Sequence, residues 1–101
     1  MENNNISTFE EGLEECISEL KNLMISKHKD YGPGNINSFG ELGVLVRTSD
    51  KVERLKHLMK SEDAPNFESM DDSWMDIANY GIIALMYRKG FWNLPLSDSG
   101  K

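Results

Sequence analysis

The segment WMDIANYGIIALMY, residues 74–87, constrains the fold most, because it is apolar on nearly every side. Such a segment is typical of a helix at the centre of a protein, and no alternation of Val, Ile and Thr competes to make it a strand. We expect this helix to be the most buried element, to start near Ser69, with Asp72 three residues on, and to run to about Lys89. Gly90 then fits a left-handed cap.

A first helix is predicted upstream, where Ser7 and Glu10 have the three-residue spacing of a capping box. Its apolar side chains, at helical spacing, are Phe9, Leu13, Ile17, Leu20 and Met24. Cys16 lies beside them and is expected in the core. The helix should end around residue 29, within the sequence KHKDYGPGN of residues 27–35, because its Gly-Pro-Gly breaks a helix.

A second helix is predicted to begin at another capping box, formed by Ser38 and Glu41, and to reach about Lys60. Its expected apolar face consists of Leu42, Leu45, Val52, Leu55 and Met59.

Two features weaken this second helix. Gly40 and Gly43 reduce the stability of its first turns, and we expect any break to fall near Thr48-Ser49. After the helix, SEDAPN is expected to form a loop, because Pro65 prevents continuation.

Together these patterns predict an all-α protein, a compact helical bundle of three long helices with room for a short fourth helix after Asn93. At 101 residues the chain has the length of one domain, residues 1–101, with residues 1–7 and 95–101 expected to be flexible. Because the third helix is apolar on more faces than two companions can cover, we expect a homodimer or a homotetramer.

The charge of the chain limits its partners. The formal net charge of −6 argues against direct binding of nucleic acid or of an anionic membrane. The longest apolar stretch, GIIALMY, is far too short to span a bilayer, and the start MENNNISTFEEG lacks the pattern of a secretion signal. A single cysteine gives no disulfide framework. We therefore expect a cytoplasmic protein without a membrane partner.

Acidic side chains form a stripe along the second predicted helix. Asp50 and Glu53 are three residues apart and His57 is four further on, so all three share one side of the helix. At about 100° per residue, this side lies roughly 80–100° from the face of Leu45 and Val52, so it should border the core. His57 itself is expected to be a surface neighbour of Glu53.

A second polar stripe is expected on the third helix. It consists of Asp72, Asp76, Asn79 and Tyr80. Asp76 stands in an apolar stretch, and a buried carboxylate is costly without a partner. One interpretation pairs it with a cation of the second helix and gives it only a packing role. The candidate cations are Arg47, Lys51 and Arg54.

The other interpretation joins the two stripes around a divalent cation. Asp50 and Glu53 would then face Asp76, with Asp72 or Asn79, across two antiparallel helices. Clustered carboxylates repel unless a cation lies among them, and oxygen ligands of this kind suit Mg²⁺ or Mn²⁺. The predicted metal ligands are Asp50, Glu53, Asp72 and Asp76.

Three ordered motifs, KHKDYG, SDKVERL and DDSWMDIANYGIIA, resemble the phage and bacterial family called nucleotide modification associated domain type 1. The resemblance spans roughly residues 13–88. Two carboxylates three apart, 22 intervening residues and then DIAN also look like the ExxE…ExxD arrangement of the all-α nucleoside triphosphate pyrophosphatases, which include the MazG-like proteins and the dimeric dUTPases. The resemblance implies a MazG-like helical fold in a bacterial or phage-infected cytosol.

The same resemblance implies roles for individual residues. Asp50, Glu53 and Asp76 would hold Mg²⁺, and Glu53 and Asp76 would be the catalytic pair. This chain has Asp76 where the superfamily has Glu, and Asn79 where it has its last Asp. Asp72, one turn before Asp76, would supply the missing carboxylate. The implied activity is Mg²⁺-dependent hydrolysis of a (deoxy)nucleoside triphosphate to monophosphate and pyrophosphate.

Residues 27–35 would line the pocket beside the metal. Lys27 would neutralise phosphate charge and Tyr31 would stack on a base, while Asp30 and Asn35 would read base or sugar edges. Alternatively, Asp30 and Asn35 only form a turn, Lys27 is a solvated charge and Tyr31 covers the core. The remaining substrate-binding candidates are Lys51, Arg54, Asn79 and Tyr80.

Two other functions stay open beside hydrolysis. One is a non-catalytic protein of phage origin that binds a nucleotide or a nucleotide signal and supports DNA modification or counters host defence. The other is an interaction protein whose acidic stripes are only salt bridges between helices. Trp74, Trp92 and the six methionines are interpreted as packing residues, some of them between subunits, and His28 is expected to be exposed.

Overall fold

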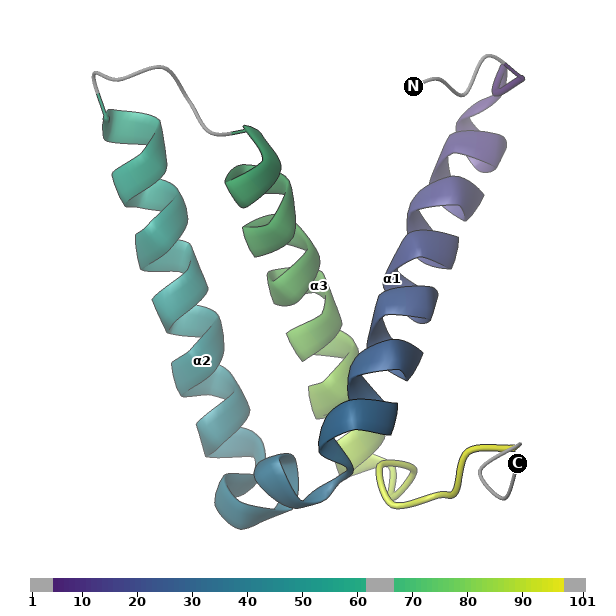
Figure 1. Ribbon diagram of the computed structural model, residues 1–101, viewed down its shortest axis with the longest axis vertical. Coiled ribbons are helices and arrows are strands. Elements are labelled where there is room, and N and C mark those ends of the chain that lie inside the picture. Colours follow the sequence, from purple (N-terminus) through teal and green to yellow (C-terminus); the bar gives the residue numbers. More distant parts are fainter. Residues whose placement is uncertain (1–4, 62–66, 98–101) are drawn as a thin grey trace. The chain divides into compact units, whose positions relative to one another are not determined.

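The computed structural model describes residues 5–61 and 67–97, except for the side chains of residues 67–69. The described residues contain three helices and no strand, so the all-α prediction is confirmed (Figure 1). The helices are α1 (Phe9–Tyr31), α2 (Gly34–Lys60) and α3 (Phe67–Arg88). The loop predicted at Pro65, and the parts of the flexible termini at 1–4 and 98–101, lie outside the described residues.

The chain divides into two compact units between two adjacent residues of the Gly-Pro-Gly sequence. The first unit is Met1–Gly32, which contains α1, and the second is Pro33–Lys101, which contains α2 and α3. The prediction of a single domain over the whole chain stays a prediction, and each unit is described by itself.

α1 begins at a capping box one residue later than the predicted Ser7–Glu10 pair. The Thr8 hydroxyl accepts a bond from the Glu11 N–H at 3.1 Å. The Glu11 carboxylate in turn accepts from the backbone N–H groups of Ser7, at 2.9 Å, and Thr8, at 3.2 Å. These bonds, from Ser7 first and then Thr8, hold the pKa of the Glu11 carboxyl below its usual value. The later pair is used because it satisfies three backbone donors at once.

α1 ends at Tyr31, two residues beyond the predicted end. Gly32 follows with φ 68° and ψ −172°, and its N–H donates to the carbonyl of His28 at 2.8 Å. Almost only glycine adopts this backbone region, so Gly32 is the residue that stops the helix. His28 is half-buried, whereas the sequence predicted an exposed histidine.

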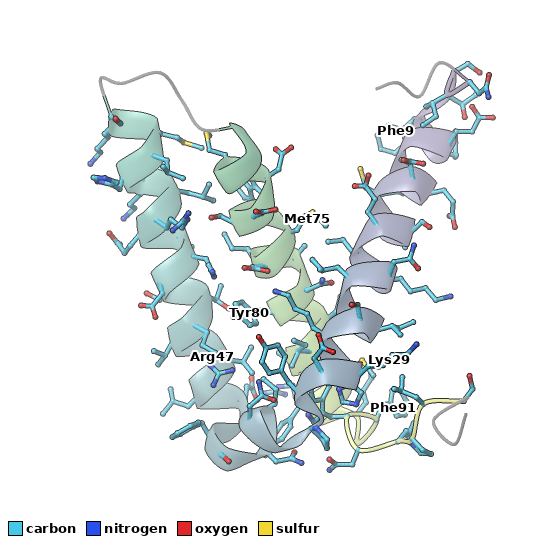
Figure 2. All side chains as sticks on the ribbon, in the orientation of Figure 1. Phe9, Lys29, Arg47, Met75, Tyr80 and Phe91 are labelled. Carbon is cyan, nitrogen blue, oxygen red and sulfur yellow. The ribbon has the colours of Figure 1, made fainter. Side chains whose placement is uncertain are left out.

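The apolar face of α1 is exposed in its first half and half-buried in its second half. No residue of α1 is buried, and Phe9, which projects from the first turn, is 81% exposed (Figure 2). Cys16 is also exposed, so its predicted place in the core was wrong. The helical spacing of the apolar residues was predicted correctly, but spacing alone does not say what covers them.

α2 begins at Gly34, before the predicted capping box. The Ser38 hydroxyl donates to the Gly34 carbonyl at 2.8 Å, so Ser38 lies inside the helix and does not cap it. The helix is kinked at Gly40, where φ is 66° and ψ is −159°. The expected break near Thr48 does not occur, because the Thr48 hydroxyl donates to the Val44 carbonyl within a regular helix.

α3 starts at Phe67, two residues before the predicted Ser69, and its end confirms the predicted left-handed cap. Gly90 has φ 80°, and its N–H donates to the Tyr87 carbonyl at 3.2 Å. The Phe91 N–H donates to the Met86 carbonyl at 2.8 Å, which completes a Schellman motif. Residues 90–97 form turns, so the fourth helix for which the sequence left room does not occur among the described residues.

α2 and α3 pack against each other and run antiparallel (Figure 1). The side of α2 that is withdrawn from solvent, which we call the α2 seam, repeats every three or four residues. It consists of Val44, Thr48, Lys51, Leu55 and Leu58. Of the predicted apolar face only Leu55 is buried, whereas Leu42, Leu45, Val52 and Met59 are exposed. The apolar face was predicted on the wrong side of α2, because the seam includes a threonine and a lysine, which a search for apolar residues does not count.

α3 is less buried than predicted. Ser73, Asn79 and Ile83 are buried, but Trp74 and Leu85 are more than half exposed. A helix that is apolar all round was expected at the centre of the core, yet within the second unit α2 covers only one side of it. The packing role predicted for Trp74 is therefore not seen in the single chain.

The segment after α3 returns to the start of α2. The buried Trp92 donates from its indole Nε1–H to the Pro33 carbonyl at 3.1 Å, so its packing role is confirmed. Asn37 donates to the Asn93 side chain at 2.7 Å. Because Pro33 and Asn37 are four residues apart, they share one side of the helix. These two bonds fix the beginning of α2 against the end of α3.

Replacement of Gly40 by alanine should destabilise the second unit by about 1–3 kcal/mol. The positive φ is strained for any residue with a Cβ, and the new Cβ would lie 3.2 Å from the Tyr87 hydroxyl oxygen. Urea unfolding followed by circular dichroism measures the change. Gly34→Ala is the matched control, because its φ is not positive and nothing lies within 4 Å of its Cβ. Equal stability of the two variants would contradict the positive φ of Gly40 and hence the kink in α2.

Candidate functional site

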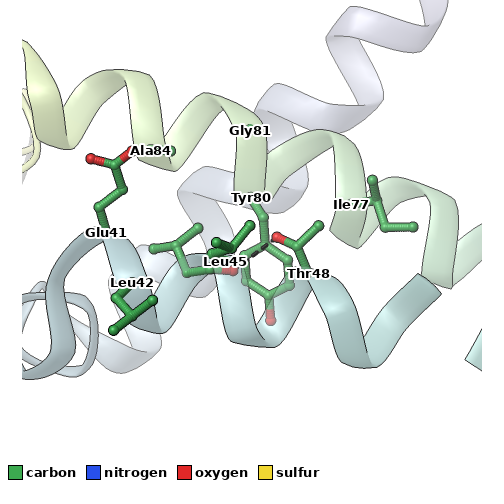
Figure 3. A pocket seen from close by; sticks show the side chains of 9 residues that line it. Glu41, Leu42, Leu45, Thr48, Ile77, Tyr80, Gly81 and Ala84 are labelled. Atoms are coloured by element: carbon green, nitrogen blue, oxygen red, sulfur yellow. Dashed lines mark hydrogen bonds between the residues drawn. The ribbon is translucent and has the colours of Figure 1, made fainter. Parts of the chain in front are cut away.

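A pocket of about 510 Å³ lies between α2 and α3 (Figure 3). Its volume falls within the range of roughly 300–1,000 Å³ that is usual for small-molecule sites. Its lining residues are Glu41, Leu42, Val44, Leu45 and Thr48 from α2, and Ile77, Tyr80, Gly81 and Ala84 from α3. All of them belong to the second unit, so the pocket is formed by one packed pair of helices.

Small side chains on α3 create this space. Gly81 and Ala84 stand opposite the longer Leu42 and Leu45 of α2, which are 69% and 63% exposed. A Cβ added to Gly81 would meet no atom within 4 Å. The buried Val44 belongs to the α2 seam and closes the inner side of the pocket. The walls are therefore mostly apolar.

Three polar side chains interrupt the apolar wall. In the close-up, the ring of Tyr80 extends from α3 toward α2 and lies between Leu45 and Thr48 (Figure 3). The Thr48 hydroxyl donates to the Val44 carbonyl at 2.8 Å, so its oxygen remains an acceptor for a ligand. Glu41 lies seven residues before Thr48, about 10 Å along the helix, at the other end of the pocket.

Glu41 is held in place by a cation of α3. The Nε of Arg88 lies 3.0 Å from both oxygens of the Glu41 carboxylate. Both side chains remain largely accessible to solvent, so the pair is open to a ligand. A flat ring with a few polar edges fits this combination of apolar walls, one aromatic ring, one hydroxyl and one carboxylate at the rim.

Of the predicted site residues, only Tyr80 lines the pocket. Asp50, Glu53 and His57 share a side of α2, as predicted, but all three are exposed. At about 100° per residue they point about 120–180° away from the α2 seam. The expectation that their stripe borders the core was therefore wrong, because the seam runs through Lys51 rather than through Leu45. The surface position predicted for His57 is confirmed.

Asp76 has a cationic partner, as the first interpretation of the sequence required. Its carboxylate lies 3.1 Å from the ammonium of Lys51, and the two side chains are only 17% and 32% exposed. Glu53 pairs at 3.3 Å with Lys56, one turn further along α2. Two of the four predicted metal ligands are thus engaged with lysines.

The described side chains, at residues 5–61 and 70–97, include no group of three or more His, Cys, Asp or Glu that could hold a metal ion. Asp50 and Asp72 are exposed and do not gather with Asp76 into such a group. As folded, this part of the chain does not fit a Mg²⁺ or Mn²⁺ ion held by carboxylates from both stripes. The metal site stays a prediction that binding measurements must test.

The other predicted substrate-binding residues lie at several places. Arg54 is exposed on α2, and Asn79 is buried within α3 rather than open to the pocket. Lys27, Asp30 and Tyr31 are exposed on the last turns of α1.

Asn35 belongs to the first turn of α2 and is exposed. The alternative that Asp30 and Asn35 form a turn was wrong, because both residues are helical and the chain turns at Gly32-Pro33 between them. Tyr31 is 69% exposed and so does not cover a core in the described residues. The roles of Lys27, Asp30, Tyr31 and Asn35 in binding a substrate stay predictions.

The pocket itself was missed from the sequence. Leu42 and Leu45 were assigned to the core, and Glu41 to a capping box that does not form. A usable signal was present in α3, where Gly81 and Ala84 are two small residues three positions apart on one side of the helix. Small residues at this spacing leave room beside a neighbouring helix, either for close packing or for a ligand.

The chain was compared with known protein families, curated proteins and solved structures. A family model described as nucleotide modification associated domain 1 matches residues 27–87, which is more than half of the chain. The matched range includes all nine residues that line the pocket. No curated protein and no solved structure matches the chain. Within the described part, no helix is both long and apolar enough to cross a bilayer.

The Lys51–Asp76 pair should contribute measurably to stability. In a double-mutant cycle of Lys51→Met and Asp76→Asn, we expect a coupling energy of about 1 kcal/mol, because a half-buried pair is poorly screened by solvent. Urea unfolding of the four proteins at low and high salt measures it.

The matched control is the exposed Lys56–Glu53 pair, whose side chains are 59% and 68% exposed. Its coupling in Lys56→Met and Glu53→Gln should be about 0.3 kcal/mol or less. Equal coupling in the two cycles would show that Asp76 is not held by Lys51 in solution.

Proposed function

The chain belongs to the nucleotide modification associated domain 1 family, and we propose that it binds a nucleotide with its base in the pocket between α2 and α3. The observation that carries the proposal is that the matched segment contains a pocket of nucleoside size with an aromatic wall. A family name that concerns nucleotides and a pocket suited to a flat heterocycle support the same class of ligand.

The base would lie against the ring of Tyr80, with Leu42 and Leu45 on the α2 side. Stacking of a base on an aromatic ring contributes about 1–3 kcal/mol and tolerates different bases. Selectivity would then come from polar edges. The Glu41 carboxylate accepts hydrogen bonds from amino or ring N–H groups, and the Thr48 oxygen accepts from a sugar hydroxyl or a base N–H.

The phosphates would leave the pocket at the end where Arg88 binds Glu41. A chain with a net charge of −6 has no general attraction for a polyanion, so a local cation is required. A guanidinium has five N–H donors, of which Nε–H binds Glu41, and its planar fork suits phosphate oxygens. Lys51, one turn beyond Thr48, is a second candidate at the opposite end of the pocket.

Hydrolysis would need more than this pocket provides. The resemblance to pyrophosphatases implies a Mg²⁺ ion held by Asp50, Glu53, Asp72 and Asp76, but these carboxylates form no group in the described residues. The Lys51 ammonium supplies the positive charge beside Asp76. We therefore propose binding without cleavage as the main function, and Mg²⁺-dependent hydrolysis as the second candidate, which the half-buried Asp76 favours.

We further propose that the protein acts in the cytosol of a bacterial or phage-infected cell. There, a protein that binds a nucleotide without cleaving it would support DNA modification or withhold a nucleotide signal from a host defence. Neither role needs contact with nucleic acid itself.

Filling the pocket should weaken nucleotide binding while the protein becomes more stable. In Gly81→Leu, the new side chain enters open space, and leucine favours a helix over glycine by about 0.8 kcal/mol. We expect calorimetric titration with a panel of purine and pyrimidine nucleoside triphosphates to show affinity at least about tenfold weaker, roughly 1.4 kcal/mol.

Three further variants serve as controls for this test. Gly34→Leu adds the same side chain at a helix start outside the pocket and should bind like wild type. Tyr80→Leu removes the ring and should weaken binding, whereas Tyr80→Phe should preserve it if stacking dominates. Unchanged affinity of both Gly81→Leu and Tyr80→Leu would place the nucleotide elsewhere and overturn the proposal.

Pyrophosphate release separates binding from hydrolysis. With Mg²⁺ and each nucleoside triphosphate, we expect no release above a buffer blank in an assay coupled to inorganic pyrophosphatase. Mg²⁺-dependent release that disappears in both Glu53→Gln and Asp76→Asn would establish the second candidate instead. A rise in melting temperature with Mg²⁺ alone, abolished by Asp76→Asn, would support the predicted metal site.

A further inference from the structure

The carboxylate of Glu41 and the guanidinium of Arg88 form a paired rim at one end of the pocket. The Nε–H of Arg88 is shared between the two carboxylate oxygens, each of which lies 3.0 Å from Nε. A carboxylate has about four lone-pair sites, so one shared hydrogen leaves both oxygens able to accept further hydrogen bonds. The Glu41 side chain is 46% exposed and that of Arg88 is 67% exposed, so a ligand can reach both groups.

The lining residues give the pocket a direction. The ring of Tyr80 lies between Leu45 and Thr48, and this is where a base would stack (Figure 3). Glu41 lies four residues before Leu45, about 6 Å along α2 on the same side of the helix. Arg88 lies eight residues after Tyr80, about 12 Å along the antiparallel α3 toward the same end. A ligand that extends from the ring toward this end therefore passes Glu41 and reaches Arg88.

A nucleotide has its groups in a fixed order, with the sugar between the base and the phosphates. The sugar is attached on the side of the base that lies away from the Watson–Crick edge, so this edge and the phosphates point in opposite directions. When the base stacks on Tyr80 and Arg88 binds the phosphates, the base edge points toward Thr48. The sugar then lies beside Glu41, which meets sugar hydroxyls rather than base N–H groups.

A carboxylate is suited to the hydroxyls of ribose. Its two oxygens can accept one bond each from the 2′- and 3′-hydroxyls, which lie side by side on one face of the sugar. An acidic side chain binds the ribose 2′-hydroxyl in this way in dinucleotide-binding folds. A 2′-deoxyribose has only one of the two donors. Phosphate oxygens have no donor at all, so they would bind the guanidinium of Arg88 and not the carboxylate.

We propose that Glu41 binds the 2′- and 3′-hydroxyls of ribose, and that the pocket therefore selects ribonucleotides over deoxyribonucleotides. This selectivity rests on the proposed nucleotide site and specifies its sugar. Because Glu41 lies at a solvent-accessible rim, water replaces part of a lost hydrogen bond. The expected preference for ribose is about tenfold, near the lower end for a hydrogen bond to a charged group.

Calorimetric titration of the wild-type chain tests the sugar preference without any substitution. The probes are ATP, GTP, CTP and UTP, each with its 2′-deoxy and 3′-deoxy forms. For the base that binds most tightly, we expect each deoxy form to bind about tenfold more weakly, because each lacks one donor to the carboxylate. Equal affinity of the ribose and 2′-deoxyribose forms would overturn the assignment of Glu41 to the sugar.

Glu41→Gln tests whether this residue causes the preference. The amide keeps one acceptor oxygen and replaces the other with an N–H donor, so the ratio of ribose to 2′-deoxyribose affinity should fall to about twofold or less. Thr48→Val is the matched control, because it removes a hydroxyl at the other end of the pocket and should leave the ratio unchanged. A ratio that is lost in Thr48→Val and kept in Glu41→Gln would place the sugar at the opposite end and overturn the proposal.

Gly81→Leu separates this outcome from a failure of the nucleotide site. If ribose and deoxyribose forms bind equally and Gly81→Leu weakens both, the pocket binds nucleotides and only the role of Glu41 is wrong. If no nucleotide binds, or if Gly81→Leu leaves the affinity unchanged, the nucleotide site is wrong and the sugar preference of the pocket is wrong with it.

Discussion

α2 and α3 pack antiparallel through side chains that recur every three or four residues, and the candidate site depends on this packing. Val44 and Leu55 are buried in the α2 seam, and Lys51 reaches Asp76 from the same seam. This lysine and aspartate join the two helices across their interface, and Asp76 is 17% exposed, so its carboxylate gains from the adjacent cation. The same packing brings Gly81 and Ala84 opposite two leucines of α2, and the space between them is the pocket.

Hydrogen bonds join the two helices at the end where α2 begins and α3 ends. At this end, Gly40 kinks α2, and Trp92 and Asn93 bind the segment before the kink at Pro33 and Asn37. The Arg88–Glu41 pair lies next to this kink and forms one rim of the pocket. A polar, solvent-accessible rim beside an apolar interior is the usual arrangement of a small-molecule site.

The sequence predicted the helices better than it predicted what covers them. Apolar spacing and the cap at Gly90 were sufficient for three helices, because both are local properties. The capping box at Ser7 failed because the adjacent Thr8–Glu11 pair has the same spacing and forms instead, and the one at Ser38 failed because the helix already begins at Gly34. The buried side of α2 was predicted at Leu45, although it includes Lys51. A search for apolar residues does not count a lysine, even where the aliphatic part of its side chain is buried. Pairing of Asp76 with a lysine was correctly among the alternatives, but the choice between a cation from the chain and a metal ion required the geometry.

The central claim is that a nucleotide occupies the pocket between α2 and α3. The most direct measurement is a titration of ¹⁵N-labelled protein with a nucleoside triphosphate, followed by amide chemical shifts. Binding in the pocket predicts that the largest shifts occur at lining residues such as Leu45, Thr48 and Gly81, and that they saturate with a single dissociation constant. Shifts confined to Asp50, Glu53 and their neighbours on the far side of α2, or no shifts at millimolar nucleotide, would contradict it.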